Sequence, residues 1–374
     1  MYYADYGTTI FNSSTRSCKS YAEKVVEALK SNPEHLLFPQ GFDYTGELSV
    51  LSFADGELEV TLHRSVRGKT VFLFTSAARN PGNLPVELCK LELYHTIDVL
   101  KRSQAAEIIV FEPYISCSRS DRTTRRNSVG LWIHYKTLIS LGVDHLITYQ
   151  LHSDKSKTMF DPCICSIDDV QTLSLLQKYL CDTSIPSHRD LVENVRENWL
   201  FCSVDAGGEK LARKFAESFG TQLVIAHKQR STTKANTVEC INLLSAVPFE
   251  GKEIWIVDDM IDTGGSIYNL ARELSSKSGK PVNIMIVHPV FSPPAIDRIT
   301  ELKNDGVLAR LVVCDTIDTH DIAPRIDFME VIGSADLSAR ITLGISQNRQ
   351  MADLIDVFSP EEYLLSREES KRRH

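Results

Sequence analysis

The stretch EIWIVDDMIDTGGSIYNLARELSS, residues 253–276, joins an apolar run, two adjacent acids, a glycine-rich turn and a set of helix-forming residues. A turn between a parallel strand and a helix can bind an anion, because the first N–H groups of the helix point outward and glycine lets the backbone wrap closely around a phosphate. The sequence therefore predicts a phosphate-binding turn made of Thr263, Gly264, Gly265 and Ser266.

Three carboxylates accompany this turn, namely Asp258, Asp259 and Asp262. Acids beside a phosphate would repel it, so they are better explained as acceptors for sugar hydroxyls or as partners of a bound Mg²⁺. Phosphate and sugar together indicate a phosphorylated ribose as the ligand. The simpler alternative is that the glycines only make a tight turn and the acids only cap the helix.

Composition limits the class of protein. The chain has 374 residues, 43% hydrophobic and 24% charged, which is enough for two α/β domains of roughly 150 residues each. A net charge of -8 argues against a nucleic-acid or membrane-surface partner. The chain shows no apolar run of about 20 residues and no signal-like start, so a cytoplasmic location is expected. The nine cysteines lack CxxC spacing and are expected to be reduced thiols.

Apolar runs alternate with helix-like segments along the chain, which is the βαβ rhythm of a parallel sheet. The first set of runs lies at 70–75, 107–112 and 145–151, and helical periodicity covers 86–101 and 129–142. A second set follows as LFCSV, QLVIA, EIWIV, NIMIV and LARLVVC. The pattern predicts an α/β fold with two similar halves. The charged end EESKRRH is expected to be frayed and solvated.

The glycine-rich turn resembles the phosphoribosyl pyrophosphate (PRPP) loop shared by phosphoribosyltransferases and ribose-phosphate pyrophosphokinases. FADGE, residues 53–57, is similar to the pyrophosphokinase element that holds the adenine of ATP in a neighbouring subunit, and EPYISCSRSDR, residues 112–122, resembles that family's ATP-binding stretch. The resemblance implies ATP contacts by Phe53, Asp55, Glu57, Arg119, Asp121 and His152.

Three further segments carry the resemblance. The resemblance of YQLHSDKSKTMFD implies that His152 lies near the ATP phosphates and is a metal ligand, and that of SVDAGGEKLARKF implies that Asp205 contacts the metal or the substrate. In AHKQR, Lys228 and Arg230 match the KxR pair that begins the family's mobile catalytic loop. Catalytic roles are thus expected for Lys228, Arg230 and His152. Taken alone, His152 would more often be a satisfied strand-end histidine, and a KxR pair would usually be solvated surface charge.

The resemblance implies two phosphoribosyltransferase-type domains, each a mainly parallel sheet flanked by helices. Their expected ranges are 1–165 and 166–340, with a tail at 341–374 that partly returns to the N-terminal domain. The implied reaction transfers the pyrophosphoryl group of ATP to ribose 5-phosphate with Mg²⁺ as cofactor. The expected assembly is a homo-oligomer built from dimers, with a hexamer as an alternative, in which subunits share the ATP site.

Other functions remain open from the sequence. A PRPP-consuming transferase would not need FADGE, the SRSDR stretch or a second domain. A non-catalytic regulatory paralogue is consistent with the departures at Ser120 and Val204, whereas His152, Lys228 and Arg230 argue against it. A pyrophosphokinase for a larger ribose 5-phosphate derivative, such as ADP-ribose, is the third alternative.

Overall fold

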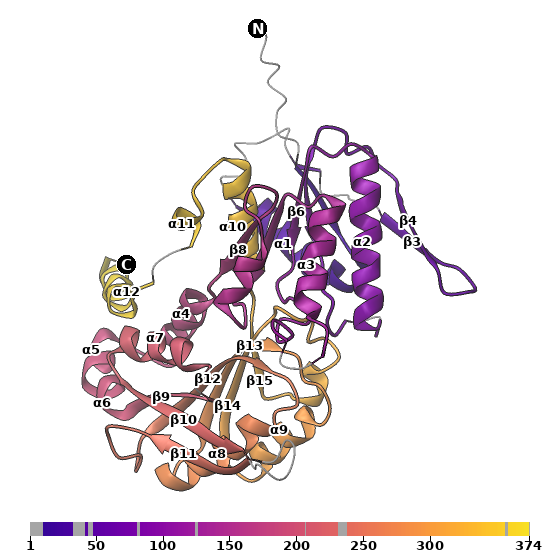
Figure 1. Cartoon of the computed structure of the whole chain (residues 1–374). Coiled ribbons are helices and arrows are strands. Elements are labelled where there is room, and N and C mark those ends of the chain that lie inside the picture. The colour runs from indigo at the N-terminus through magenta and orange to yellow at the C-terminus, as the bar shows by residue number, and fades with distance from the viewer. Residues whose placement is uncertain are drawn as a thin grey trace. The chain divides into compact units, whose positions relative to one another are not determined.

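The computed structural model describes residues 10–32, 42–43, 48–80, 83–123, 126–205, 207–230, 238–355 and 358–373 (Figure 1). The chain divides into two compact units. The first unit consists of 1–171, 316–320 and 333–355, and the second consists of 172–315, 321–332 and 356–374.

The first unit contains a six-stranded sheet in the order β2-β1-β5-β6-β7-β8, and all its neighbouring strands are parallel. The strands TVFLF, EIIVF and HLITY are short apolar or β-branched runs of the kind that a sheet covered on both faces requires. The strands are β1 (Ile10–Ser14), β2 (Phe42–Asp43), β5 (Thr70–Phe74), β6 (Glu107–Phe111), β7 (His145–Tyr149) and β8 (Ser166–Val170).

Helices cover both faces of this sheet. Alternate strand residues point to opposite faces, so Phe72 and Ile109 pack with α1 (Lys19–Ser31) and α10 (Ala335–Ser346). On the other face, the sheet packs with α2 (Val86–Arg102) and α3 (Gly130–Leu141). The remaining helices of the unit are η1 (Arg16–Cys18), η3 (Asp154–Met159) and α11 (Met351–Leu354).

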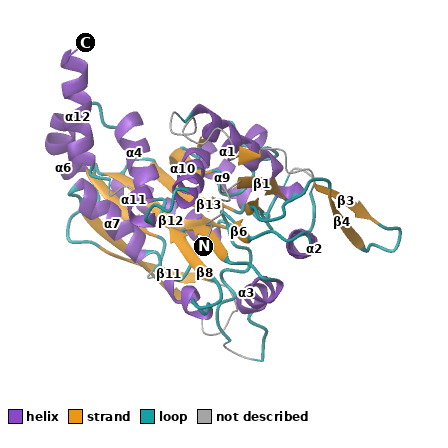
Figure 2. Ribbon diagram, turned by 90° about the horizontal axis from the view of Figure 1, so that it is seen from above, coloured by secondary structure: helices purple, strands orange, loops and turns teal. Residues whose placement is uncertain are grey.

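A two-stranded antiparallel hairpin extends from the first unit. It consists of β3 (Leu48–Ser52) and β4 (Leu58–Leu62). Among the described residues, these two strands pair with each other and with no other strand. Figures 1 and 2 both show its tip projecting away from the helices and strands of the first unit. The tip carries the FADGE sequence, so these residues lie far out on the first unit.

The second unit contains a seven-stranded sheet in the order β11-β10-β9-β12-β13-β14-β15, in which only the β10–β11 pair is antiparallel among the described strands. The strands are β9 (Trp199–Ser203), β10 (Gln222–Arg230), β11 (Val238–Leu244), β12 (Glu253–Ile261), β13 (Val282–Pro289), β14 (Leu308–Cys314) and β15 (Met329–Ile332).

The two faces of this sheet carry different helices. Ile254 and Ile256 of β12 pack with α8 (Gly265–Ser278) and α9 (Ala295–Asn304). Trp255 and Val257, which point the other way, belong to the cluster formed with helices α4 and α7. The helices on and around that face are α4 (Leu173–Thr183), α5 (His188–Asp190), η4 (Leu191–Val195), α6 (Arg196–Asn198), α7 (Glu209–Phe219) and α12 (Pro360–Arg373), and η5 (Ala323–Arg325) follows β14.

The structure confirms the predicted fold class, with two α/β units built on mainly parallel sheets. The expectation that residues 368–374 are frayed is wrong for 368–373, which belong to α12, whereas Glu369, Ser370 and Lys371 are exposed to solvent as expected. The domain ranges expected from the sequence stay a prediction. Among the described residues, no helix is both long and apolar enough to cross a bilayer.

Candidate active site

The carboxyl ends of β9 and β12 form a topological switch point in the second unit. The two strands are parallel neighbours, with Val257 opposite Ser203. From β9 the chain passes through α7 to β10 on one side, and from β12 it passes through α8 to β13 on the other. Helices α7 and α8 cover opposite faces of the sheet. Open α/β sheets bind ligands in the crevice that such a reversal leaves.

The predicted phosphate turn lies at this switch point. Asp258 and Asp259 are the sixth and seventh residues of β12, and α8 begins at Gly265. Gly264 is the residue before the helix, with φ of +73°, a conformation that a residue with a Cβ adopts only under strain. The turn therefore delivers the first N–H groups of α8 to the end of β12, where an anion can accept them.

Arg298 holds this turn from helix α9. Its Nη1 donates a 2.8 Å hydrogen bond to the carbonyl of Thr263 and lies 3.1 Å from the position of a Cβ on Gly265. The backbone N–H of Phe291 also donates to the carbonyl of Ile261 at 2.9 Å. Sequence reasoning gave Arg298 no role, although it belongs to the segment HPVFSPPAIDRI.

A second acidic loop follows β9. Oδ1 of Asp205 accepts hydrogen bonds from the N–H groups of Gly207 at 2.8 Å and Gly208 at 3.2 Å, so the carboxylate closes its own loop. A Cβ on Gly208 would lie 3.0 Å from Oδ1 of Asp258. The two loops therefore approach each other closely, and Gly208 permits that approach.

Three carboxylates shape the electrostatics of this edge. Burial raises the pKa of Asp258 well above its usual value, and the charges of Asp259 and Asp205 raise it further. Oδ1 of Asp258 accepts the backbone N–H of Asp259 at 3.1 Å. Such an edge attracts cations and hydroxyl donors. It suits a sugar with a metal ion, while the turn beside it suits the phosphate.

Lys228 and Arg230 lie on β10 rather than in a loop after it. The pairing of β10 with β9 ends at Ile225 opposite Ser203, and β10 then continues with β11 as its partner, with Lys228 opposite Ile241. Both residues thus lie beyond the carboxyl end of β9, at the same edge of the sheet from which the acidic loops leave. The rest of the expected catalytic loop, 231–237, lies outside the described residues.

The predicted ATP-binding stretch follows β6 in the first unit. Arg119 is exposed and Asp121 is half-buried. Between them, the N–H of Gly130, the first residue of α3, donates to Oγ of Ser120 at 3.0 Å. Cys117 has φ of +60°, so the stretch bends sharply before Arg119. His152 is exposed and follows β7, the parallel neighbour of β6, so it leaves the same edge of the sheet.

The three remaining predicted ATP contacts lie on the exposed tip of the hairpin. The N–H of Phe53 donates to the carbonyl of Glu57 at 2.8 Å, and the N–H of Glu57 donates to Oδ1 of Asp55 at 3.1 Å. These bonds close the turn and leave the ring of Phe53 43% exposed. The hairpin interpretation and the adenine-binding interpretation of FADGE are compatible, because the hairpin carries the side chains outward.

The donor set allows Mg²⁺ at the acidic edge. Among the described residues, no three His, Cys, Asp or Glu side chains are arranged to hold a metal by themselves. Mg²⁺ usually needs only one or two protein carboxylates, because water and substrate phosphates complete its coordination. The carboxylates of Asp205, Asp258 and Asp259 fit this requirement. His152, the other predicted ligand, belongs to the first unit.

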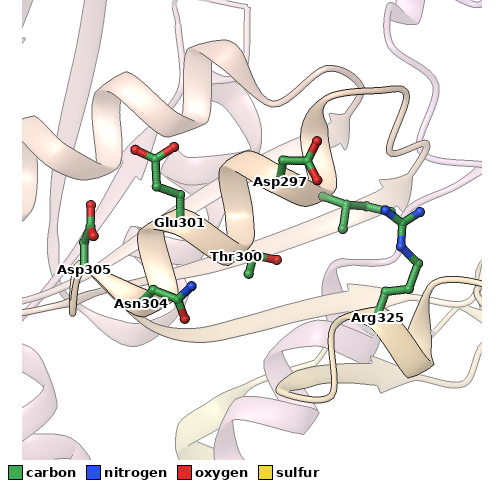
Figure 3. A pocket seen from close by; sticks show the side chains of 7 residues that line it. Asp297, Thr300, Glu301, Asn304, Asp305 and Arg325 are labelled. Atoms are coloured by element: carbon green, nitrogen blue, oxygen red, sulfur yellow. The ribbon is translucent and has the colours of Figure 1, made fainter.

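A separate hollow of about 490 Å³ lies along α9 (Figure 3). Three of the side chains that line it are the carboxylates of Asp297, Glu301 and Asp305, with Arg325 from η5. Arg272 of α8 already pairs with Glu301 at 2.9 Å and with Asp305. Excess negative charge makes this hollow unsuitable for a phosphate, and it shares no residue with the phosphate turn.

Comparisons with known proteins agree with these features. Residues 10–142 match the family model described as the N-terminal domain of ribose phosphate pyrophosphokinase, and residues 188–308 match a phosphoribosyl transferase domain. The chain is 34% identical over 313 residues to ribose-phosphate pyrophosphokinase 1 of Streptococcus pneumoniae, covering 83% of this chain and 90% of that protein. It is 32% identical over 345 residues to ribose-phosphate pyrophosphokinase 1 of Streptococcus pyogenes, covering 90% and 99%.

The fold is also similar to a solved structure. Phosphoribosylpyrophosphate synthetase from Mycobacterium smegmatis matches with a TM-score of 0.75 and 24% identity, over 91% of this chain and 100% of that one. This likeness bears on the fold alone.

Proposed function

We propose that this chain, which belongs to the ribose-phosphate pyrophosphokinase family, transfers the pyrophosphoryl group of ATP to ribose 5-phosphate and releases PRPP and AMP. The observation that carries this proposal is the sequence similarity to the streptococcal enzymes, 34% and 32% identity over most of both chains. The comparisons do not favour the alternatives left open by the sequence, a regulatory paralogue and a kinase for a larger ribose 5-phosphate derivative.

Ribose 5-phosphate is the ligand proposed for the switch point of the second unit. The N–H groups at the start of α8 and the hydroxyls of Thr263 and Ser266 suit its phosphate. Asp258, Asp259 and Asp262 accept from the ribose hydroxyls. Arg298 supports the turn by its bond to the Thr263 carbonyl and thereby keeps the phosphate-binding groups in place.

ATP is the ligand proposed for the first unit. Arg119 supplies a cation for its phosphates and Asp121 supplies an acceptor, and His152, which follows the neighbouring strand β7, is the third proposed contact. We further propose that Phe53, Asp55 and Glu57 bind the adenine of ATP held by a second copy of the chain, so that the working form is a homo-oligomer. The exposed hairpin supports this part, because its tip extends from the first unit (Figure 2).

The reaction is a displacement at phosphorus. The anomeric hydroxyl of ribose 5-phosphate attacks the β-phosphorus of ATP and releases its proton to solvent, the bond from that phosphorus to the oxygen bridging the α- and β-phosphates breaks, and AMP leaves with the electron pair. Negative charge builds up on the phosphoryl oxygens, and Lys228 and Arg230 are the cations proposed to stabilise it. Mg²⁺, when bound through carboxylates such as Asp205, would neutralise phosphate charge.

The test is to incubate the purified chain with MgCl₂, ATP and ribose 5-phosphate and to measure AMP and PRPP. Equal amounts of AMP and PRPP are expected, and product formation should stop when EDTA removes the metal. ADP as the product would show ordinary γ-phosphoryl transfer and overturn the proposal. A parallel incubation with ADP-ribose tests whether the enzyme uses the larger acceptor. If neither ribose 5-phosphate nor ADP-ribose gives AMP, the regulatory paralogue is favoured. A cytoplasmic location stays a prediction.

A further inference from the structure

Helix α3 contacts both ends of the stretch that we propose to bind ATP. At the far end, its first two residues bind Ser120, because the N–H of Gly130 donates to the Ser120 Oγ at 3.0 Å and the N–H of Leu131 donates to the Ser120 carbonyl at 3.2 Å. At the near end, Nε2 of His134 lies 2.9 Å from Oε2 of Glu112, the residue that follows β6. Arg119 and Asp121 therefore lie on a segment attached to one helix.

The near-end contact continues into helix α2. Nδ1 of His134 lies 2.9 Å from Oη of Tyr94, so a chain of two hydrogen bonds joins α2, α3 and the end of β6. The side chain of Glu112 is fully buried and that of His134 is 1% exposed. Oε1 of Glu112 is buried and has no hydrogen-bond partner among the described residues. The carboxylate thus depends on His134 for its orientation.

The directions of these bonds depend on the protonation of the His134 ring. When the Glu112 carboxylate is ionised it can only accept, so Nε2 of His134 then donates to it. With a neutral ring Nδ1 accepts from the Tyr94 hydroxyl, and with a doubly protonated ring Nδ1–H donates to the Tyr94 oxygen. Burial raises the pKa of Tyr94, and the charge of Glu112 raises it further, so the phenol keeps the proton that it donates. In both states of the ring, each of its nitrogens is hydrogen-bonded to a neighbouring side chain.

Other charged and titratable groups surround the hydrogen bonds between Tyr94, His134 and Glu112. Lys90, one turn before Tyr94 on α2, has a side chain that is 9% exposed, and its Nζ donates to Glu87 at 2.9 Å. Burial alone would lower the pKa of Lys90, but the bond to Glu87 and nearby acidic groups raise it overall, so it stays charged. Cys117 is half-buried within the stretch itself, and burial raises its thiol pKa. The Tyr135 hydroxyl is buried beside His134.

We propose that Tyr94, His134 and Glu112 are positioning residues that hold the proposed ATP-binding stretch, residues 112–122, in its binding conformation. An apolar pair could fill the same space, but it would allow the stretch to shift, whereas directional hydrogen bonds specify one arrangement of a buried segment. The inference rests on the proposed function, because it takes this stretch as the ATP site. It assigns to the three side chains no contact with ATP.

The test compares the KM for ATP and the KM for ribose 5-phosphate in variants of Tyr94, His134 and Glu112. His134→Phe keeps an aromatic ring but removes both bonds, and it should raise the KM for ATP about tenfold, the loss expected for a hydrogen bond to a charged group. The KM for ribose 5-phosphate should not change. Glu112→Ala should behave like His134→Phe. Glu112→Gln keeps an oxygen that can accept from Nε2, so it should restore the KM for ATP close to that of the unaltered enzyme.

His145→Phe is the matched control. His145 forms a comparable bond, from Nε2 to Oδ2 of Asp168 at 2.8 Å, at the first residue of β7 and so at the opposite end of that strand from His152. Its loss should leave both KM values unchanged. Equal increases in both KM values for His134→Phe, or no increase in a folded His134→Phe, would overturn the inference.

Two measurements keep the outcome decisive. If His134→Phe does not fold, Tyr94→Phe decides, since it removes only one hydroxyl and should raise the KM for ATP in the same direction by a smaller factor. A folded Tyr94→Phe enzyme with an unchanged KM would contradict the proposal. Calorimetric titration of ATP into each variant measures the dissociation constant of ATP without turnover, and so tests the positioning role directly. Lack of PRPP from the unaltered enzyme would instead defeat the proposed function.

Discussion

Oδ1 of Asp258 lies 3.0 Å from the position that a Cβ atom on Gly208 would occupy, although Asp258 belongs to β12 and Gly208 follows β9. Contacts this short between a Cβ and a carboxylate oxygen force one of the two groups to move. The Asp258 carboxylate and the loop that contains Asp205 and Gly208 therefore leave little room for a side chain at residue 208.

We expect Gly208→Ala to weaken the use of ribose 5-phosphate. The added methyl group would push the Asp258 carboxylate away, and a displacement of this size in a binding group should raise the KM for ribose 5-phosphate about tenfold or more. The KM for ATP should change little. Steady-state kinetics with each substrate varied in turn measures both values, and Lys210→Ala, an exposed position two residues further on, is the control. An unaltered KM in Gly208→Ala would show that the carboxylate can move freely.

Asp258→Asn should make the metal-free enzyme more stable and less active. Because burial and the neighbouring acids raise the folded-state pKa of Asp258, ionisation opposes folding. Its protonated form is favoured in the folded state, so stability is lost as the pH rises from the ordinary aspartate pKa of about 3.9 through the raised value. Asparagine removes this loss and still offers an oxygen to the Asp259 N–H.

Thermal unfolding in EDTA at several pH values measures this effect. The Tm of Asp258→Asn should exceed that of the unaltered enzyme near neutral pH, and the difference should shrink toward acid pH. A Tm difference that grows on acidification would contradict the assigned direction of the pKa shift. The same variant should show a higher KM for ribose 5-phosphate.

Lys228→Ala should reduce turnover far more than substrate affinity. A cation that is needed chiefly when charge develops on the phosphoryl oxygens affects kcat, and its loss should lower kcat by about 10²–10³-fold. Arg230→Ala should act in the same direction. Rapid-quench measurement of AMP formation separates chemistry from product release, with Lys214→Ala on the exposed side of α7 as the control. Near-normal turnover would remove Lys228 from the catalytic set.

Mixing two inactive variants should restore activity if subunits share the ATP site. Phe53→Ala/Glu57→Ala alters the hairpin tip, and Lys228→Ala alters β10, so some mixed interfaces would combine an intact tip with an intact catalytic cation. Subunit exchange followed by the PRPP assay measures the recovery, and each variant exchanged with itself is the control. Full activity of an enzyme shown by ultracentrifugation to be monomeric would refute the shared site.

The sequence by itself determined the local elements of this protein. Runs such as EIIVFE became β6, because a strand covered on both faces needs apolar residues throughout, and that need is visible in a short window. The glycine-rich turn was located correctly between β12 and α8, because glycine marks such a turn in the sequence. Gly264 has a positive φ, which glycine adopts without strain. The acids around the turn and their chemistry could also be named from the sequence.

Only the tertiary structure decided which of these elements meet. The pairing of β9 with β12 brings Asp205 beside Asp258, and the folding of α9 brings Arg298 onto the carbonyl of Thr263, yet neither contact leaves a periodic signal along the chain. The bonds from Tyr94 to His134 to Glu112 were hidden for a further reason. Each residue lies in a different element, so a buried polar side chain is recognisable only when packing shows its partner.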